Sequence, residues 1–240
     1  MNEDRNCTLP DCTTQEVIDS LLQNVVRPGM CELRTYLKWE GFYTSPASTK
    51  YHGCYEGGLA QHSYDVYCQL VARVATLRLG EVMSFGQKPL PIKPENLIVA
   101  ALLHDVCKIG AYLGDAKPYK WNRAQPKGHA LLSIERISQY IELEPIEELM
   151  IRYHMGLYGL HEFEGKGEYP LQGKSQGSKE DRYGKSLRNA WYHNPICKVI
   201  YFCDELATLS EKAREFQTAQ ELLKSEPVSC DGGERAAAAD

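Results

Sequence analysis

A histidine and an aspartate stand side by side in the most apolar segment of the chain. His104 and Asp105 interrupt the run LIVAALLHDVCKIGAY, which is apolar enough to form a helix buried on most sides. Burying a carboxylate there is costly unless it is paired or binds a cation. Lys108 follows three residues after Asp105, on the same expected helical surface. The pattern predicts either a buried Asp105–Lys108 ion pair beside a hydrogen-bonded histidine, or a metal site.

Further imidazole and carboxylate groups fall at the ends or on the inward faces of other predicted helices. His154 continues the apolar stripe of its helix, and Asp204 lies one turn after a buried isoleucine in the last long helix. His62 lies near the start of a helix and His129 immediately precedes one. Each residue alone is typical of a satisfied core histidine or a paired acid. A single cluster explains all six together: His62, His104, Asp105, His129, His154 and Asp204.

Such a set of ligands predicts a metal centre. Imidazole and carboxylate groups suit divalent ions, so we expect one or two ions of Mn, Fe, Ni, Co, Mg or Zn. Asp105 is the natural bridge if there are two. A divalent ion lowers the pKa of a water that it binds and so supplies a nucleophile at neutral pH. The cluster therefore predicts hydrolase chemistry with Asp105 as a catalytic residue.

The elements that must position these residues are helices. Apolar spacing is helical almost throughout and strand alternation is nearly absent, so the predicted fold class is all-α. We expect helices at about 14–26, 29–40, 59–79, 95–112, 130–142, 145–156 and 195–223. The expected organisation is a partly frayed N-terminal segment at 1–28, one domain at 29–223 with loop insertions at 113–128 and 157–193, and a flexible tail at 224–240.

Composition narrows the classes of function. The 240 residues, 43% of them hydrophobic, fit one globular domain. A formal charge of −5 disfavours long duplex DNA as a partner. No run of 18 apolar residues is present, so no membrane span is expected. Nine cysteines without a CxxC pair, in a chain without a secretory signal, indicate a cytoplasmic protein.

The order His, His-Asp, His, His and a distant Asp resembles the HD superfamily of metal-dependent phosphohydrolases. LLHDVCKIG is similar to its central motif and YHGCYEGGLAQHSYDV to its upstream motif. GHALLSIERI, IRYHMGLYG and VIYFCDELAT match the remaining segments, so the resemblance covers roughly residues 30–215. It implies an HD-domain helical bundle with the metal site in its core. It also implies that His62, His104, Asp105 and Asp204 hold the main ion, and that His129 and His154 complete a second site.

The resemblance also implies an activity. The segment FYTSPASTKYHGCYEGGLAQH looks like the catalytic domain of bacterial 3′→5′ exoribonucleases of this superfamily, although about 28 preceding residues are too few for their OB-type domain. We expect cleavage of a phosphate ester or anhydride of a nucleotide or short oligonucleotide by a metal-activated water. Lys108 would stabilise charge on the phosphoryl oxygens or orient that water. Two alternatives stay open: a catalytically silent nucleotide-binding signalling module and an HD-type di-iron oxygenase.

The loop before His129 carries local positive charge. Residues 114–127 hold four basic side chains against the single acid Asp115. The basic residues are Lys117, Lys120, Arg123 and Lys127. Arginine and lysine at the mouth of a pocket are common partners of phosphate, so we expect this loop to bind the substrate. The alternative is a solvated loop.

Two other features concern the substrate side of the site. His52 matches the upstream histidine of the family, which implies contact with phosphate or with a second metal. The segment 157–193 is either a flexible lid or a surface insertion. The expected partner is a phosphorylated small molecule, and the sequence leaves the oligomeric state open.

Overall fold

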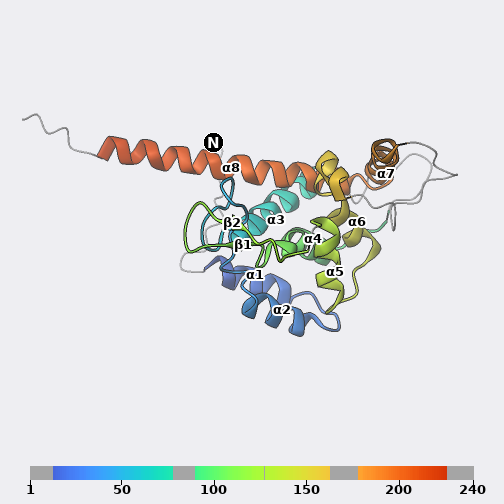
Figure 1. Ribbon diagram of the computed structural model, residues 1–240. Coiled ribbons are helices and arrows are strands. Elements are labelled where there is room, and N and C mark those ends of the chain that lie inside the picture. The colour runs from blue at the N-terminus through green and yellow to red at the C-terminus, as the bar shows by residue number, and fades with distance from the viewer. Residues whose placement is uncertain (1–12, 78–89, 127, 163–177, 226–240) are drawn as a thin grey trace, which may run out of the picture.

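The structure is a computed structural model that describes residues 13–77, 90–126, 128–162 and 178–225 (Figure 1). Within these residues the regular secondary structure is helical apart from one short antiparallel hairpin, which confirms the all-α class. The helices are α1 (Thr14–Gln23), α2 (Met30–Trp39), α3 (Gly58–Leu77), α4 (Pro94–Leu103), α5 (Ala130–Ser138), α6 (Pro145–Tyr153), α7 (Lys179–His193) and α8 (Ile196–Ser225). Two 3₁₀ segments, η1 (Val106–Lys108) and η2 (Gly156–Glu162), and the strands β1 (Tyr112–Leu113) and β2 (Lys120–Trp121) complete it.

Local sequence signals set several helix starts. Pro94 and Pro145 occupy first-turn positions of α4 and α6, where the missing N–H costs nothing. Thr13 caps α1 and exchanges hydrogen bonds with Glu16. Two residues of α1, Ile18 and Leu22, are fully buried in the main core. The domain therefore already includes α1, which lies inside the segment that we expected to precede it.

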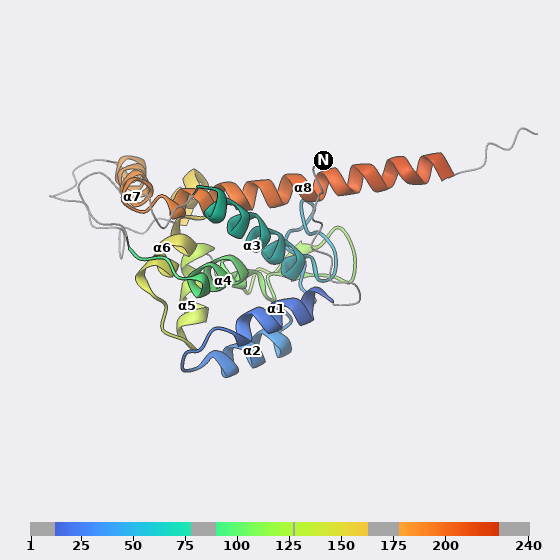
Figure 2. The ribbon, with the colours of Figure 1, turned by 180° about the vertical axis from the view of Figure 1, so that it is seen from behind.

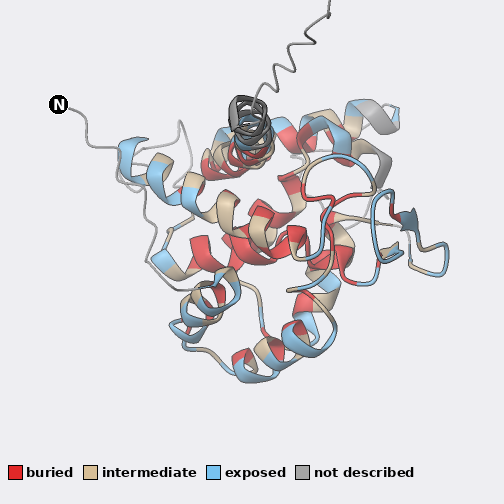
Figure 3. Ribbon diagram, turned by 90° about the vertical axis from the view of Figure 1, so that its left-hand side faces the viewer, coloured by how far each residue is buried: buried red, intermediate tan, exposed pale blue. Residues whose placement is uncertain are grey.

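The core is built around α4, whose residues 96–103 are all buried (Figure 3). Helices α3 and α6 contact α4, and α8 lies along α3. Figures 1 and 2 show α8 running across one side of the bundle, with its C-terminal part extending past the body. The residues that could do chemistry thus sit on the helices that form the centre of the molecule.

The expected helix at 95–112 ends early. It stops at Leu103, so His104 and Asp105 follow the helix and do not lie inside it. The Nδ1 atom of His104 lies 2.8 Å from the carbonyl oxygen of Ala101, and it competes for the group that would accept the next helical hydrogen bond. The chain then turns through η1, and a positive φ of 68° at Gly110 leads it into the hairpin.

Helix α7 lies within the stretch that we expected to be a loop at 157–193. A capping box at Ser178 and Asp181 starts it, and Tyr183, Leu187 and Ala190 pack against Tyr153 of α6 as a small second core. The expected lid or insertion is therefore partly an ordered helix. Residues 163–177 lie outside the part of the chain that the structure describes.

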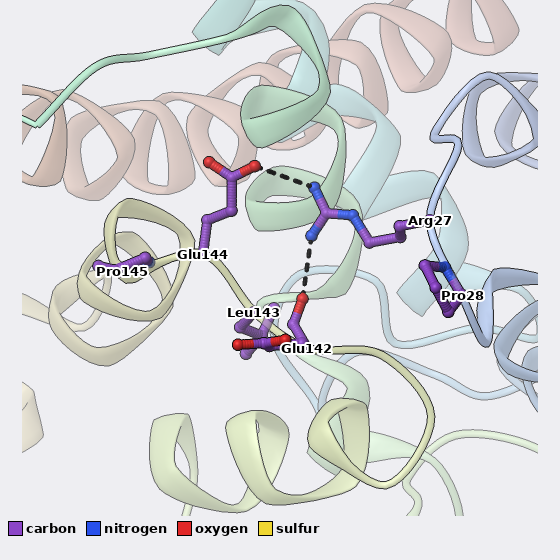
Figure 4. Close-up of a pocket in the computed structure, with 6 residues that line it drawn as sticks. All are labelled: Arg27, Pro28, Glu142, Leu143, Glu144 and Pro145. Carbon is purple, nitrogen blue, oxygen red and sulfur yellow. Dashed lines mark hydrogen bonds and ion pairs between the residues drawn. The ribbon is translucent and has the colours of Figure 1, made fainter.

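A buried charge network joins the α1–α2 connection to α6. Both oxygens of the fully buried Glu147 accept hydrogen bonds from Arg27, at 2.8 and 2.9 Å. Glu147 also accepts from the Asn96 side chain at 2.9 Å and from the backbone N–H of Glu144 at 2.8 Å. Figure 4 shows the pocket around Arg27, where the guanidinium also reaches Glu144 and the carbonyl oxygen of Glu142. Each oxygen of Glu147 therefore has hydrogen-bond partners, and the network stabilises the packing of α6 against the α1–α2 connection.

Removing the Glu147 carboxylate should therefore destabilise the fold. We expect Glu147→Ala to lower the free energy of unfolding by about 3–5 kcal/mol, because Arg27 would be left buried without its main partner. Urea unfolding of the variant measures the change. Glu142→Ala is the matched control, since that side chain is exposed and should cost less than about 0.5 kcal/mol. Equal stability of the two variants would contradict the assignment.

None of the helices in the described ranges combines the length and the apolarity needed to cross a membrane.

Candidate metal centre

Five segments bring the six expected ligands to one place. His62 comes from α3, the His104-Asp105 pair follows α4, His129 precedes α5, His154 follows α6 and Asp204 lies on α8. Adjacent rings are close: the centroids of His62 and His104 are 5.5 Å apart, those of His104 and His154 4.8 Å, and those of His129 and His154 5.3 Å. The structure therefore assembles the whole predicted set.

Asp105 is the centre of this cluster. Its Oδ1 atom lies 2.7 Å from Nε2 of His129 and 3.7 Å from Nε2 of His154. Its Oδ2 atom lies 3.3 Å from Nε2 of His104 and 2.6 Å from Nζ of Lys108. Each carboxylate oxygen thus faces at least two groups, and both oxygens face ligand histidines. This arrangement is compatible with a bridging ligand.

A second acid closes the other side. Nε2 of His62 lies 2.9 Å from Oδ1 of Asp204 and 3.9 Å from Oδ2 of Asp105. The side chain of Asp204 is 19% exposed, whereas those of His62 and Asp105 are almost fully buried. The side chain of His129 is equally exposed, so the cluster is accessible to solvent beside both Asp204 and His129.

Two histidines are oriented by their own backbone. Nδ1 of His104 donates to the carbonyl oxygen of Ala101 at 2.8 Å, and Nδ1 of His154 donates to that of Ile151 at 2.6 Å. Because a carbonyl only accepts, the neutral form of each ring carries its proton on Nδ1 and its lone pair on Nε2. Both Nε2 atoms are buried without a hydrogen bond of normal geometry. Helix ends thus present two lone pairs to the cluster.

The electrostatics keep the acids charged. Burial alone would raise the pKa of Asp105, but Lys108 and the neighbouring histidines lower it well below its ordinary value. Burial would lower the pKa of Lys108, but Asp105 raises it. Burial lowers the pKa of His154 to about 3, reinforced by the two neighbouring histidines. Burial would also lower the pKa of His104 and His129, but Asp105 raises both, and Cys107 further raises that of His129. The cluster thus offers carboxylates and the neutral imidazole of His154, whereas an ion at His104 or His129 competes with a proton.

The donors present fit a metal ion. Three sets have ligand atoms close enough to share one: His62 with His104 and Asp105, His104 with His154 and Asp204, and Asp105 with Cys107 and His129. Buried imidazole nitrogens with a lone pair but no hydrogen-bond donor beside them cost folding free energy. A bound cation would remove that cost. The Asp105–Lys108 ion pair that we weighed as an alternative is present, but it leaves those nitrogens unexplained.

His52 lies next to the cluster without belonging to the predicted ligand set. Its ring centroid is 4.7 Å from that of His62, and its Nε2 atom is buried without a hydrogen bond. The following residue, Gly53, donates its N–H to the buried carboxylate of Glu211 on α8 at 2.7 Å. This contact holds the loop of His52 over the site. Burial, aided by His62, lowers the pKa of His52 to about 3, so the ring is neutral.

The basic loop at 114–127 is not paired with the acids of the cluster through the basic residues that the structure describes. Lys117, Lys120 and Arg123 are exposed on and around the β1–β2 hairpin, and in the described part of the chain none of them forms an ion pair with Asp105 or Asp204. Lys127 lies outside the described residues. The hairpin nevertheless begins four residues after Lys108. Its Tyr112 packs edge-on against Trp121, with 5.7 Å between ring centroids.

Sequence reasoning missed two residues of the site. Cys107 lies 3.3 Å from Nδ1 of His129, whereas its place in an apolar run is typical of a small buried hydrophobe. Tyr112 is the other: burial raises the pKa of its phenol and the neighbouring Lys108 lowers it, which places the two groups together. The signal for Cys107 was its position two residues after Asp105. Tyr112 gave no such signal.

No family model, curated protein or solved structure matches the chain. The fold and the site define an all-helical protein with a buried His/Asp cluster that could hold a divalent ion.

Proposed function

We propose that the protein is an HD-type, metal-dependent phosphohydrolase that acts on a nucleotide or a short oligonucleotide. The observation that carries the proposal is the convergence of six imidazole and carboxylate groups, from five segments, in one cluster centred on Asp105. The order of these residues along the chain, which resembles the HD superfamily, supports the same class.

The chain's own residues have distinct tasks in this proposal. His62, His104, Asp105 and Asp204 would hold one ion, and His129 and His154 would complete a second site with Asp105 as bridge. A bound divalent ion supplies a water of lowered pKa and polarises phosphoryl oxygens. Lys108 holds Asp105 from the side opposite His129 and keeps a positive charge next to the cluster, which favours a phosphate group as the reacting centre.

A screen with reconstituted metal tests the proposal. The purified protein is stripped of metal, loaded separately with each of the divalent ions named above, and incubated with nucleotides, cyclic dinucleotides and short RNA. We expect release of phosphate or nucleotide with at least one pairing. Stoichiometric metal without turnover of any of these substrates would instead support a catalytically silent module.

The basic residues of the hairpin region should affect substrate binding more than chemistry. Replacing Lys117, Lys120 and Arg123 together by alanine should raise KM by about tenfold with little change in kcat, if they bind ground state and transition state equally. Two or three phosphate contacts also predict a shallow dependence of affinity on salt. Steady-state kinetics at several salt concentrations measure both quantities. An unchanged KM would show that this exposed loop is only solvated.

A further inference from the structure

Cys107 contacts the outer nitrogen of a predicted ligand histidine. His104 and His154 each direct Nδ1 at a carbonyl oxygen of their own helix, as described above. Nδ1 of His129 instead lies 3.3 Å from Sγ of Cys107. A carbonyl can only accept a hydrogen bond, whereas a thiol can donate or accept one. The proton position on His129 is therefore set by a different kind of partner.

The contact is held by the surrounding backbone. The N–H of Cys107 donates to the hydroxyl of the buried Ser133 at 3.1 Å, and the N–H of Ser133 donates to the carbonyl oxygen of His129 at 3.0 Å. Arg136, in the last turn of α5, donates to the carbonyl oxygens of Val106 in η1 and of Ile109 directly after it, at 3.0 Å each. These bonds fix η1 against α5. Four hydrogen bonds that do not involve the thiol or the imidazole thus hold Cys107 next to His129.

The other nitrogen of His129 faces the cluster, 2.7 Å from Oδ1 of Asp105. For this Nε2 to bind a metal it must present a lone pair, so the remaining ring proton must sit on Nδ1. A buried N–H without an acceptor costs free energy, and Sγ of Cys107 is the acceptor within reach. Without that acceptor, the tautomer with its proton on Nε2, facing the Asp105 carboxylate, is favoured, and that form cannot bind a metal through Nε2.

We infer that Cys107 is a positioning residue that holds His129 in its metal-binding tautomer by accepting the Nδ1 proton in a hydrogen bond. The inference rests on the proposed metal centre and concerns its second site, formed by Asp105, His129 and His154. It makes occupancy of that second site depend on a side chain that does not itself bind the ion. Partners of this kind typically change metal affinity 10- to 100-fold, by the general range known for outer-shell groups.

Two substitutions separate the acceptor from the volume of the side chain. Cys107→Val keeps a side chain of similar size and removes the acceptor, while Cys107→Ser keeps an acceptor. Calorimetric titration with Mn²⁺ and elemental analysis give the number and affinity of bound ions. We expect wild type to bind two ions per chain, Cys107→Val to bind the second about 10- to 100-fold more weakly, and Cys107→Ser to retain most of that affinity. The affinity for the first ion should be unchanged in both variants.

The tautomer itself can be read directly. In wild-type protein labelled with ¹⁵N-histidine and loaded with Zn²⁺, long-range ¹H–¹⁵N correlations should show the His129 proton on Nδ1. The reverse tautomer in the loaded protein would overturn the inference, and this measurement holds even if Cys107→Val fails to fold. A thiolate-to-metal charge-transfer band after loading with Cd²⁺ that is present in wild type and lost in Cys107→Val would also overturn it, since Cys107 would then be a ligand.

The outcomes also separate this inference from the proposed function. Two ions bound equally well by wild type and Cys107→Val would overturn the role of Cys107 and leave the metal centre standing. A single ion bound to wild type would likewise overturn it, because the second site would then be unused. No ion bound to wild type would overturn both.

Discussion

Asp105→Ala is expected to lose bound metal and phosphohydrolase turnover together. Asp105 is the residue on which three histidines and Lys108 converge, so its removal takes a ligand from both proposed sites. Because outer-shell partners alone change metal affinity 10- to 100-fold, loss of this ligand should weaken binding by more than about 100-fold. Elemental analysis and turnover of the substrate found by the screen measure the two effects. A variant with full metal content and full activity would rule out the assignment.

Two controls keep this experiment interpretable. Asp105→Ala also leaves Lys108 buried without its partner, which can destabilise the fold by about 3–5 kcal/mol. The double variant Asp105→Ala with Lys108→Met removes both charges and should fold better while still lacking metal. Asp19→Asn is the matched control, because Asp19 pairs with Arg34 near the surface, away from the cluster. It should retain metal and turnover.

The ligand set could be predicted because each of its members violates a local expectation. An acid such as Asp105 beside a histidine in an apolar segment needs a partner, and the sequence shows that need before any fold is known. His154 could be placed inward from its helical stripe in the same way. What the sequence could not show is that α4 and α6 end at these histidines, because that depends on a side-chain bond to the backbone three residues earlier.

Other features depend on tertiary contacts that leave no local signal. Cys107 reads as a small buried hydrophobe, and its contact with His129 exists only because η1 packs against α5. Helix α7 could not be predicted from its sequence, which is rich in charge. Its buried residues form a narrow stripe that becomes a core only against Tyr153 of α6; they are Tyr183, Leu187 and Ala190. Helix α1 lies before the predicted start of the domain, yet two of its residues belong to the main core. The burial of α1 depends on its packing against α3 and α4, which the spacing of its residues alone does not reveal.

Lys108→Met should lower kcat far more than it lowers metal content. Nζ of Lys108 lies 2.6 Å from Asp105, and that carboxylate keeps the pKa of Lys108 above its ordinary value, so a positive charge is held beside the reacting centre. Loss of one preorganised charge of this kind typically costs about 10²–10³ in kcat, or about 2.7–4 kcal/mol of transition-state stabilisation.

The measurement compares kcat, KM and bound metal in the wild type and in three variants. Lys108→Arg keeps the positive charge and should recover part of the lost kcat. If the ion pair were only structural, kcat would recover only together with the stability of the fold. Thermal unfolding of each variant distinguishes a role in catalysis from a role in stability. Lys212→Met is the matched control, because Lys212 is exposed on α8, and it should leave all three quantities unchanged. Should Lys108→Met turn over substrate at the wild-type rate, Lys108 would be left with only the ion pair to Asp105, and the argument from its charge to a phosphate substrate would fall with it.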